Sequence, residues 1–167
     1  MGNRIAIRTP TPQDGRSFVA AVKASTRLHR SWVAPPSTPG QFAAYLERMS
    51  LPENAAFLVC RNDNGQLAGV VNITNIVRGV FRSGYLGYYA FAGQERQGFM
   101  REGLRAVTRH AFNRLGLHRL EASIQPGNAA SIALARSCGF AKEGYSPRYL
   151  KLGGRWRDHE RWAILAP

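Results

Sequence analysis

The sequence predicts a mixed α/β fold around one twisted sheet, and three observations indicate this class. Between residues 84 and 140, apolar strand patterns alternate with amphipathic helix patterns. Turns typical of β-hairpins, Asn62-Asp-Asn-Gly65 and Gly153-Gly154, each separate two further strand patterns. The 167 residues contain no linker, repeat or low-complexity segment, so residues 1–167 are expected to form a single domain.

The first half of the chain is expected to hold one edge strand, two helices and a three-strand meander. Thr9-Pro10 ends the edge strand, and a helical pattern follows it. Prolines preclude a helix in the next loop, and Ser37 or Thr38 then provides an N-cap for the second helix. The expected elements are a strand at 5–8, a helix at 12–28, a loop at 29–36, a helix at 38–49, and strands at 55–60, 66–77 and 85–91.

A glycine-bearing loop and a long helix follow the central strand. Five apolar residues fall on one face of this helix because their spacing is three or four positions: Met100, Leu104, Val107, Ala111 and Leu115. The polar loop at 93–98 precedes the helix, and Gly116 closes it. Backbone N–H groups at such a helix N-terminus form a ready site for a phosphate or a pyrophosphate.

A second strand–helix unit repeats this arrangement nearer the C-terminus. A strand at 120–124 comes first, and Asn128 is then a good N-cap for a short helix that runs to about Cys138. Ser131 lies in the first turn of this helix, where the helix dipole favours developing negative charge. Gly139 ends the helix, and a terminal hairpin is expected from strands at 143–152 and 157–165.

Three ordered motifs carry a resemblance to a known family: GFMREGL at 98–104, NAASIALARSCGF at 128–140, and EGYSPRYLKLGGRWRDHERWAIL at 143–165. On these motifs the chain resembles the GNAT-fold N-acetyltransferases, and among them the RimJ/RimL type that acetylates ribosomal-protein alanine. The resemblance covers most of the chain. It implies a GNAT fold, with a mixed central twisted sheet of about seven strands flanked by about four helices. In that fold, splayed central strands form the acetyl-CoA cleft.

The resemblance also implies acetyl-CoA as the co-substrate and no metal. The main-chain N–H groups expected to hold the pyrophosphate are those of Gln97, Gly98, Phe99, Met100 and Arg101. The family usually has a glycine where this chain has Arg96, and the arginine is expected to add a guanidinium for the phosphates. The acyl-pantetheine chain is expected along the strand edge at Tyr89, Ala90 and Phe91, with a further contact from Asn128.

Two side chains are expected to carry the chemistry. Many members of the family use a tyrosine of the last helix to protonate the departing thiolate, but Ala135 stands at that position here. The RimJ/RimL branch instead offers Ser131 as the acid. Glu121 is the expected base, although some relatives have acids where Ser123 or Leu150 stands. An N-terminal amine has a pKa of ~7.7–8.0, so a carboxylate acting through water would suffice.

The same resemblance places an acceptor pocket. The residues expected to contact the acceptor are Trp32, Asn72, Tyr88, Trp156 and Asp158, with His29 beside them. Among these, Trp156 would wall the peptide cleft and Asp158 would orient the substrate amine. The two cysteines, Cys60 and Cys138, form neither a metal-binding nor a disulfide pattern and are expected to be small buried side chains.

Charge points to the kind of partner. Twenty-three Lys and Arg against ten Asp and Glu give a net charge of +13, and such a surface favours a polyanion such as RNA or a ribonucleoprotein. It argues against a free polycationic substrate. No apolar run approaches the ~20 residues of a membrane span, and the N-terminus has no signal-peptide pattern. A cytoplasmic protein without a membrane partner, either a monomer or a homodimer, is therefore expected.

Three functions remain open at this point. The first is an acetyl-CoA-dependent N-acetyltransferase that acts on the N-terminal α-amine of a protein, with a ribosomal protein or a ribosomal particle as the candidate partner. The second is an acetyltransferase of a small-molecule amine, such as an amino acid, an amino sugar or an antibiotic. The third belongs to another class: a non-catalytic module that binds acyl-CoA and RNA.

Overall fold

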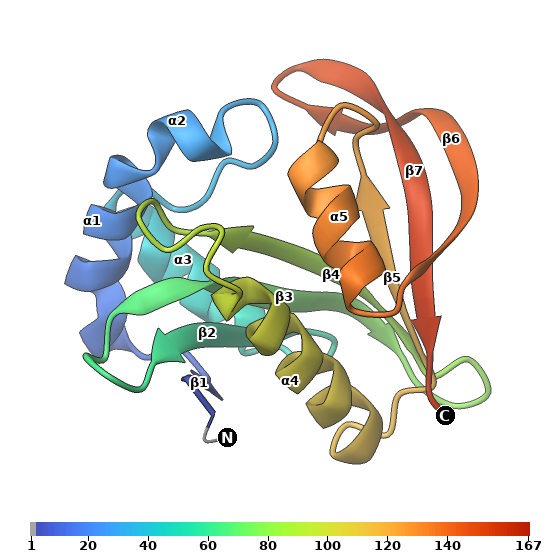
Figure 1. Ribbon diagram of the computed structural model, residues 1–167, viewed down its shortest axis with the longest axis horizontal. Helices are drawn as coiled ribbons and strands as arrows, with labels where there is room; N and C mark the ends of the chain where they lie inside the picture. Colours follow the sequence, from blue (N-terminus) through green and yellow to red (C-terminus); the bar gives the residue numbers. More distant parts are fainter. Residues whose placement is uncertain (1–2) are drawn as a thin grey trace.

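One mixed seven-stranded sheet organises the computed structural model, which describes residues 3–167 (Figure 1). The strand order is β1-β2-β3-β4-β5-β7-β6, and only β4 and β5 run parallel. The strands are β1 (Ile5–Arg8), β2 (Ala55–Arg61), β3 (Leu67–Val77), β4 (Ser83–Ala90), β5 (Arg119–Ile124), β6 (Ala141–Leu152) and β7 (Arg155–Leu165). The predicted mixed α/β sheet is confirmed.

Helices cover both faces of this sheet. The helices are α1 (Gly15–Ala24), α2 (Thr26–His29), α3 (Pro39–Met49), α4 (Phe99–Asn113) and α5 (Ala129–Ser137), with a 3₁₀ turn, η1 (Pro12–Asp14), before α1. One hydrophobic cluster joins α1 and α3 to the sheet through Phe18, Tyr45 and Leu58. The other joins α4 and α5 to the opposite face and includes Leu104 and Val71.

The helix predicted over 12–28 is wrong as one continuous element, because the chain breaks at Ser25. The buried Ser25 hydroxyl donates to the carbonyl oxygen of Ala21 at 2.6 Å and accepts from the N–H of Ala92 at 2.9 Å. A side chain that bonds back to the preceding turn competes with the helical hydrogen-bond pattern. As a result, α2 is a separate short helix, and residues 3–167 contain five helices where about four were expected. His29 ends α2 and does not belong to the following loop, where the sequence had placed it.

Strands β4 and β5 part halfway along their length. They pair only where Ser83–Leu86 faces Arg119–Ala122, whereas residues 87–90 of β4 pair with β3 alone. The predicted splay of the central strands is therefore confirmed. It leaves one edge of β4 open toward the space between α2 and α5 (Figure 1).

The two helices beside this opening begin as the sequence predicted. Gly98 is the N-cap of α4 and has a left-handed φ of 83°. The Asn128 side chain caps α5 by accepting the Ser131 N–H at 3.3 Å. Gly139, with a φ of 93°, ends α5, and Phe140 is buried behind it. Within residues 3–167, no helix is long and apolar enough to span a bilayer.

Candidate active site

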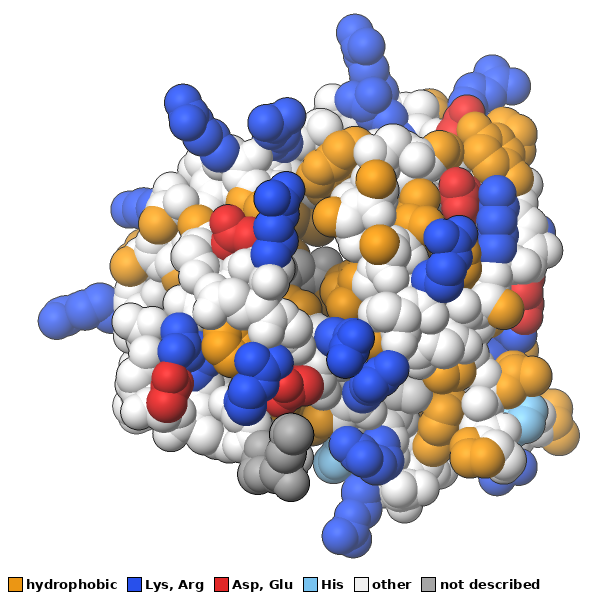
Figure 2. Space-filling model, viewed as in Figure 1, with side chains coloured by type: hydrophobic (Ala, Val, Ile, Leu, Met, Phe, Trp, Pro, Cys, Tyr) orange, Lys and Arg blue, Asp and Glu red, His pale blue; other side chains and the backbone are white. Residues whose placement is uncertain are grey.

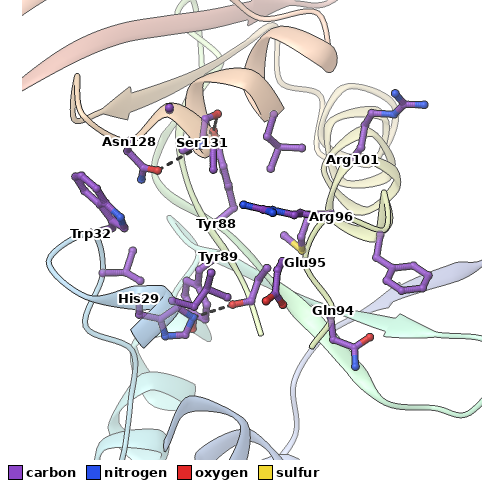
Figure 3. Close-up of a pocket in the computed structure, with 18 of the residues that line it drawn as sticks. His29, Trp32, Tyr88, Tyr89, Gln94, Glu95, Arg96, Arg101, Asn128 and Ser131 are labelled. Atoms are coloured by element: carbon purple, nitrogen blue, oxygen red, sulfur yellow. Dashed lines mark hydrogen bonds between the residues drawn. The ribbon is translucent and has the colours of Figure 1, made fainter. Parts of the chain in front are cut away.

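A pocket of about 940 Å³ lies at the splay, between α2, the loop that precedes α4, and α5 (Figure 3). This volume is at the upper end of the range for small-molecule and cofactor sites. Eleven of the seventeen predicted site residues line it: Trp32, Tyr88, Tyr89, Ala90, Arg96, Gly98, Phe99, Met100, Arg101, Asn128 and Ser131. The fold thus brings together residues that come from four separate segments of the chain.

Three residues of the loop between β4 and α4 have a left-handed backbone conformation. Gly93, Arg96 and Gly98 have left-handed φ values of 87°, 63° and 83°. Alternation of left- and right-handed residues turns successive N–H groups toward one side, which makes a concavity for an anion. The N-terminus of α4 follows directly and adds its free N–H groups.

Arg96 occupies a conformation that glycine adopts more readily. A left-handed φ costs an L-residue with a side chain roughly 1–2 kcal/mol, and glycine adopts it freely. The guanidinium extends across the pocket toward Tyr88, whereas Arg101 points away from the pocket centre (Figure 3). The Arg96 side chain therefore places a cation inside the pocket, and its predicted contact with a phosphate stays a prediction.

The hydroxyls of Ser131 and Tyr88 form a pair on the α5 side of the pocket. Ser131 Oγ donates to Tyr88 Oη at 3.0 Å, and Tyr88 Oη donates to the Ser131 carbonyl oxygen at 3.2 Å. Burial raises the pKa of Tyr88 to about 12, against a smaller opposing effect of the hydrogen bond with Ser131. Tyr88 therefore keeps its proton at any physiological pH.

His29 holds the end of β4 from the opposite side. Its Nε2 atom lies 2.7 Å from the carbonyl oxygen of Ala90, and because a carbonyl only accepts, Nε2 carries the proton. The imidazole also meets Tyr89 edge to face, with 5.1 Å between the ring centroids. Among residues 3–167, the Tyr89 hydroxyl has no hydrogen-bond partner, and burial raises its pKa.

Two predicted cofactor residues lie outside the pocket lining. Phe91 is buried and packs edge to face against Phe18 in the α1–α3 cluster. Gln97 turns its side-chain amide back to the Gly93 carbonyl oxygen at 2.8 Å, which stabilises the loop from within. The contacts expected of both residues are made by their main-chain groups. The positions of their side chains do not test these contacts, which stay predictions.

Glu121 and Asn72 are both engaged by neighbours outside the pocket. Arg119 donates to the Glu121 carboxylate at 2.7 Å and also pairs with Glu143. Asn72 accepts a hydrogen bond from the Tyr45 hydroxyl. The base role of Glu121 and the acceptor role of Asn72 stay predictions, since neither side chain lines the pocket.

The hairpin residues are also separate from the pocket lining. Asp158 accepts hydrogen bonds from the Tyr145 hydroxyl at 2.6 Å and from the Arg148 N–H at 2.8 Å, and so holds the bulge in β6. Trp156 is 60% exposed near the end of the hairpin. Their predicted contacts with an acceptor remain untested.

Sequence reasoning missed several residues that line the pocket. Gln94 and Glu95 belong to the polar loop at 93–98, which the sequence had identified as a binding loop. Their polar side chains in that loop could have indicated a place in the pocket. Leu28 and Val33 gave no such signal, because their positions depend on the break at Ser25. The complete set of missed residues is Leu28, Val33, Gln94, Glu95, Ala129, Ala130 and Leu134, with His29 named before only as a neighbour. In the described part of the chain, no three His, Cys, Asp or Glu side chains are grouped to hold a metal ion.

Comparison with known families agrees with the fold. The family model described as "Acetyltransferase (GNAT) domain" matches residues 4–141. The chain belongs to the GNAT acetyltransferase family and is an N-acetyltransferase by class.

Two relatives illustrate the extent of the sequence similarity. "Probable N-acetyltransferase YjcK" of Bacillus subtilis is 35% identical over 123 residues, which make up 74% of this chain and 68% of that protein. The [ribosomal protein uS5]-alanine N-acetyltransferase of Escherichia coli is 39% identical over 105 residues, or 63% of this chain and 54% of that enzyme. The match with the second relative thus spans about half of its length.

Solved structures with the same fold include enzymes with different acceptors. RimJ of Mycobacterium smegmatis, in complex with CoA-disulfide, superposes with a TM-score of 0.87 at 24% identity, covering 97% of this chain and 82% of that one. Spermidine N-acetyltransferase of Vibrio cholerae, in complex with CoA and spermine, gives 0.82 at 20% identity, with 97% and 95% covered. At these identities the likeness shows the fold and leaves the acceptor open.

Proposed function

We propose that this protein transfers an acetyl group from acetyl-CoA to the N-terminal α-amine of a protein, in the manner of the ribosomal-protein-alanine N-acetyltransferases. The observation that carries the proposal is one pocket that joins the open edge of β4, the left-handed loop before α4 and the Ser131–Tyr88 pair. The E. coli relative, an alanine N-acetyltransferase of a ribosomal protein, supports the choice of acceptor.

The residues of the pocket fit acetyl-CoA as a co-substrate. The N–H groups at the N-terminus of α4 and the Arg96 guanidinium suit a pyrophosphate, since both supply hydrogen bonds and positive charge. The unpaired edge at 87–90 offers backbone groups to an extended amide chain such as pantetheine. Acetyl-CoA supplies a thioester, whose carbonyl is open to attack by a neutral amine.

Ser131 and Tyr88 are suited to donate the proton that the departing thiolate needs. Ser131 lies in the first turn of α5, where the helix dipole stabilises negative charge. Tyr88 Oη accepts the Ser131 hydroxyl at 3.0 Å and stays protonated because its pKa is raised, so Tyr88 positions the serine hydroxyl on the β4 side of the pocket. The two hydroxyls together would replace the tyrosine that the family usually carries at the position of Ala135.

Deprotonation of the acceptor amine needs less help from the protein than protonation of the departing thiolate. An α-amine has a pKa of ~7.7–8.0, so a substantial fraction is neutral at pH 7. Glu121 lies one residue before the strands part and is the proposed base, acting through water because Arg119 holds its carboxylate.

The charge of the pocket favours a protein N-terminus over a polyamine. In the described part of the chain, Glu95 is the only carboxylate lining the pocket, against the two guanidinium groups of Arg96 and Arg101. A polyamine carries several positive charges and would meet this excess of cations as well as the +13 surface. An N-terminal amine carries one charge and loses it before it reacts.

Release of CoA from acetyl-CoA tests this proposal. The purified protein is given a peptide that begins with Ala, the same peptide with its N-terminus already acetylated, spermidine, or free alanine. Turnover of the free Ala peptide alone would support the proposal. Turnover confined to spermidine or alanine would overturn it in favour of a small-amine enzyme, and an equal rate with the blocked peptide would point to lysine side chains.

A further inference from the structure

A basic surface runs from the middle of α4 to the turn between β3 and β4. Two segments, 78–94 and 103–120, contain no Asp or Glu at all. Their exposed arginines are Arg78, Arg82, Arg105, Arg109 and Arg114, here called the arginine surface. Among residues 3–167, none of the five forms a salt bridge.

Hydrogen bonds hold the two segments together as one surface. Arg78 Nη1 donates to the Leu115 carbonyl oxygen at 3.1 Å, just beyond the end of α4. The His118 N–H donates to the Arg82 carbonyl oxygen at 2.7 Å. Figure 2 shows Lys and Arg side chains over α4 in the lower part of the molecule, and Figure 1 shows α4 running there from the loop beside the pocket.

Two apolar side chains project from the same surface. Val80 is 106% exposed and Phe81 is 53% exposed, and both lie between Arg78 and Arg82 in the turn. A phenylalanine that leaves about half of its surface in water contributes less to the fold than one buried in the core. A ring flanked by guanidinium groups is, however, a platform on which an unpaired nucleotide base can stack.

We propose that the arginine surface binds RNA, at a single-stranded stretch or a loop. Guanidinium groups match phosphate oxygens through paired hydrogen bonds, and the surface uses arginine without a single lysine. Arg105 and Arg109 lie one helical turn apart, about 6 Å along the axis, so both can follow one phosphate backbone. Phe81 adds the stacking contact.

This inference goes beyond the proposed function and does not depend on it. The arginine surface begins at the middle of α4 and continues beyond its C-terminus, whereas the N-terminus of α4 lines the pocket. Bound RNA would therefore leave the acceptor opening free. An enzyme held in this way on an RNA-containing particle would meet the N-termini of that particle's proteins at high local concentration.

Fluorescence anisotropy with a labelled oligouridine, measured over a series of salt concentrations, tests the proposal. The main variant is Arg109→Ala/Arg114→Ala, because neither side chain forms a hydrogen bond with any of residues 3–167 that its loss would break. Arg16→Ala/Lys23→Ala on α1 removes the same charge elsewhere and serves as the matched control. Phe81→Ala tests stacking separately.

The expected results differ for the two kinds of contact. The Arg109→Ala/Arg114→Ala variant should bind about tenfold more weakly, and the slope of log affinity against log salt should fall by about 1.4, at about 0.7 per phosphate contact. Phe81→Ala should also bind about tenfold more weakly but keep the wild-type slope, since stacking releases no counterions. Acetylation of a free Ala peptide should be the same in all four proteins.

Two results would overturn the proposal. One is equal loss of RNA binding in the α1 control and in Arg109→Ala/Arg114→Ala, which would reduce the effect to net charge. The other is binding to phosphatidylglycerol vesicles without binding to oligouridine, which would make the surface a membrane contact. Peptide acetylation is measured separately. Either of these results would therefore overturn RNA binding without bearing on the proposed transferase function.

Discussion

Ser131 Oγ lies 3.0 Å from Tyr88 Oη, and this hydrogen bond joins α5 to β4 across the mouth of the splay. The bond is reciprocated, because the tyrosine hydroxyl also donates to the Ser131 carbonyl oxygen. Tyr88 belongs to the first half of the sheet, and Ser131 follows β5 in the second half. The proposed acid is therefore assembled from two parts of the fold that no local sequence pattern connects.

Loss of either hydroxyl should slow turnover without weakening acetyl-CoA binding. Ser131→Ala keeps the α5 cap, because Asn128 accepts the backbone N–H of residue 131, and turnover should fall about a hundredfold. Tyr88→Phe should have an effect of similar size. The double variant should be no worse than the slower single variant, since the two groups act as one unit.

Steady-state kinetics together with acetyl-CoA titration separates chemistry from binding in these variants. Equal losses in turnover and in acetyl-CoA affinity would make Ser131 a structural residue. Additive losses in the double variant would show two independent roles.

The pH dependence of kcat/KM should rise once and then stay level. The rise should follow deprotonation of the acceptor amine, with a pKa of ~8. Since burial raises the pKa of Tyr88 to about 12, no fall is expected between pH 8 and about 10. A fall with a midpoint below pH 10 in the wild type, absent from Tyr88→Phe, would contradict the raised pKa of this acid.

Arg96 offers a test that separates charge from backbone conformation. Arg96→Ala and Arg96→Gly both remove the guanidinium, but only glycine adopts the φ of 63° without strain. If the guanidinium binds phosphate, both variants should raise the KM for acetyl-CoA by about tenfold and leave kcat unchanged. An unchanged KM in Arg96→Gly, with a raised KM in Arg96→Ala alone, would assign the residue to loop shape.

Asp14 should make the stability of the protein depend on pH. Arg8 donates two hydrogen bonds to its carboxylate, and this pairing lowers the pKa of Asp14 below its ordinary value of 3.8. A depressed pKa stabilises the fold above the unfolded-state pKa, and the contribution is lost as pH falls through the folded-state pKa. Asp14→Asn should therefore lower the free energy of unfolding by about 1–2 kcal/mol at pH 7.

The difference between wild type and Asp14→Asn should shrink below about pH 4, as followed by thermal denaturation. Asp63→Asn is the matched control, because Asp63 also pairs with an arginine, Arg61, but is exposed. Little change in melting temperature is expected there. Equal effects of the two substitutions at pH 7 would contradict a special role for the buried carboxylate.

Local patterns were enough to predict two of the helices that border the pocket, α4 and α5. The apolar spacing through Leu104 and Val107 marked α4, and Asn128 with Gly139 marked the two ends of α5. These signals succeed because helix periodicity and capping act within a few residues. The splay itself followed from the family resemblance, since nothing local tells two parallel strands where to part.

The residues that were misplaced depend on contacts between distant segments. The Ser25 hydroxyl bonds back to Ala21 and also receives the N–H of Ala92, which is 67 residues away and which no local pattern indicates. Glu121 shares one face of β5 with Arg119, two residues before it, and the two side chains form an ion pair, while the base role of Glu121 stays a prediction. Pairing of this kind can be suggested by strand alternation but not decided by it.

The short hydrogen-bonded ladder between β4 and β5 also makes the sheet less stiff at this position than elsewhere. Four residue pairs join β1–β4 to the half formed by β5, β7 and β6, so this seam is the natural hinge between two stiffer halves. The amides of β4 inside the seam should exchange with deuterium only when the whole fold opens, while those at 87–90 that face the gap exchange through local bending. Flexure of the sheet at this seam would therefore change the width of the opening between β4 and β5.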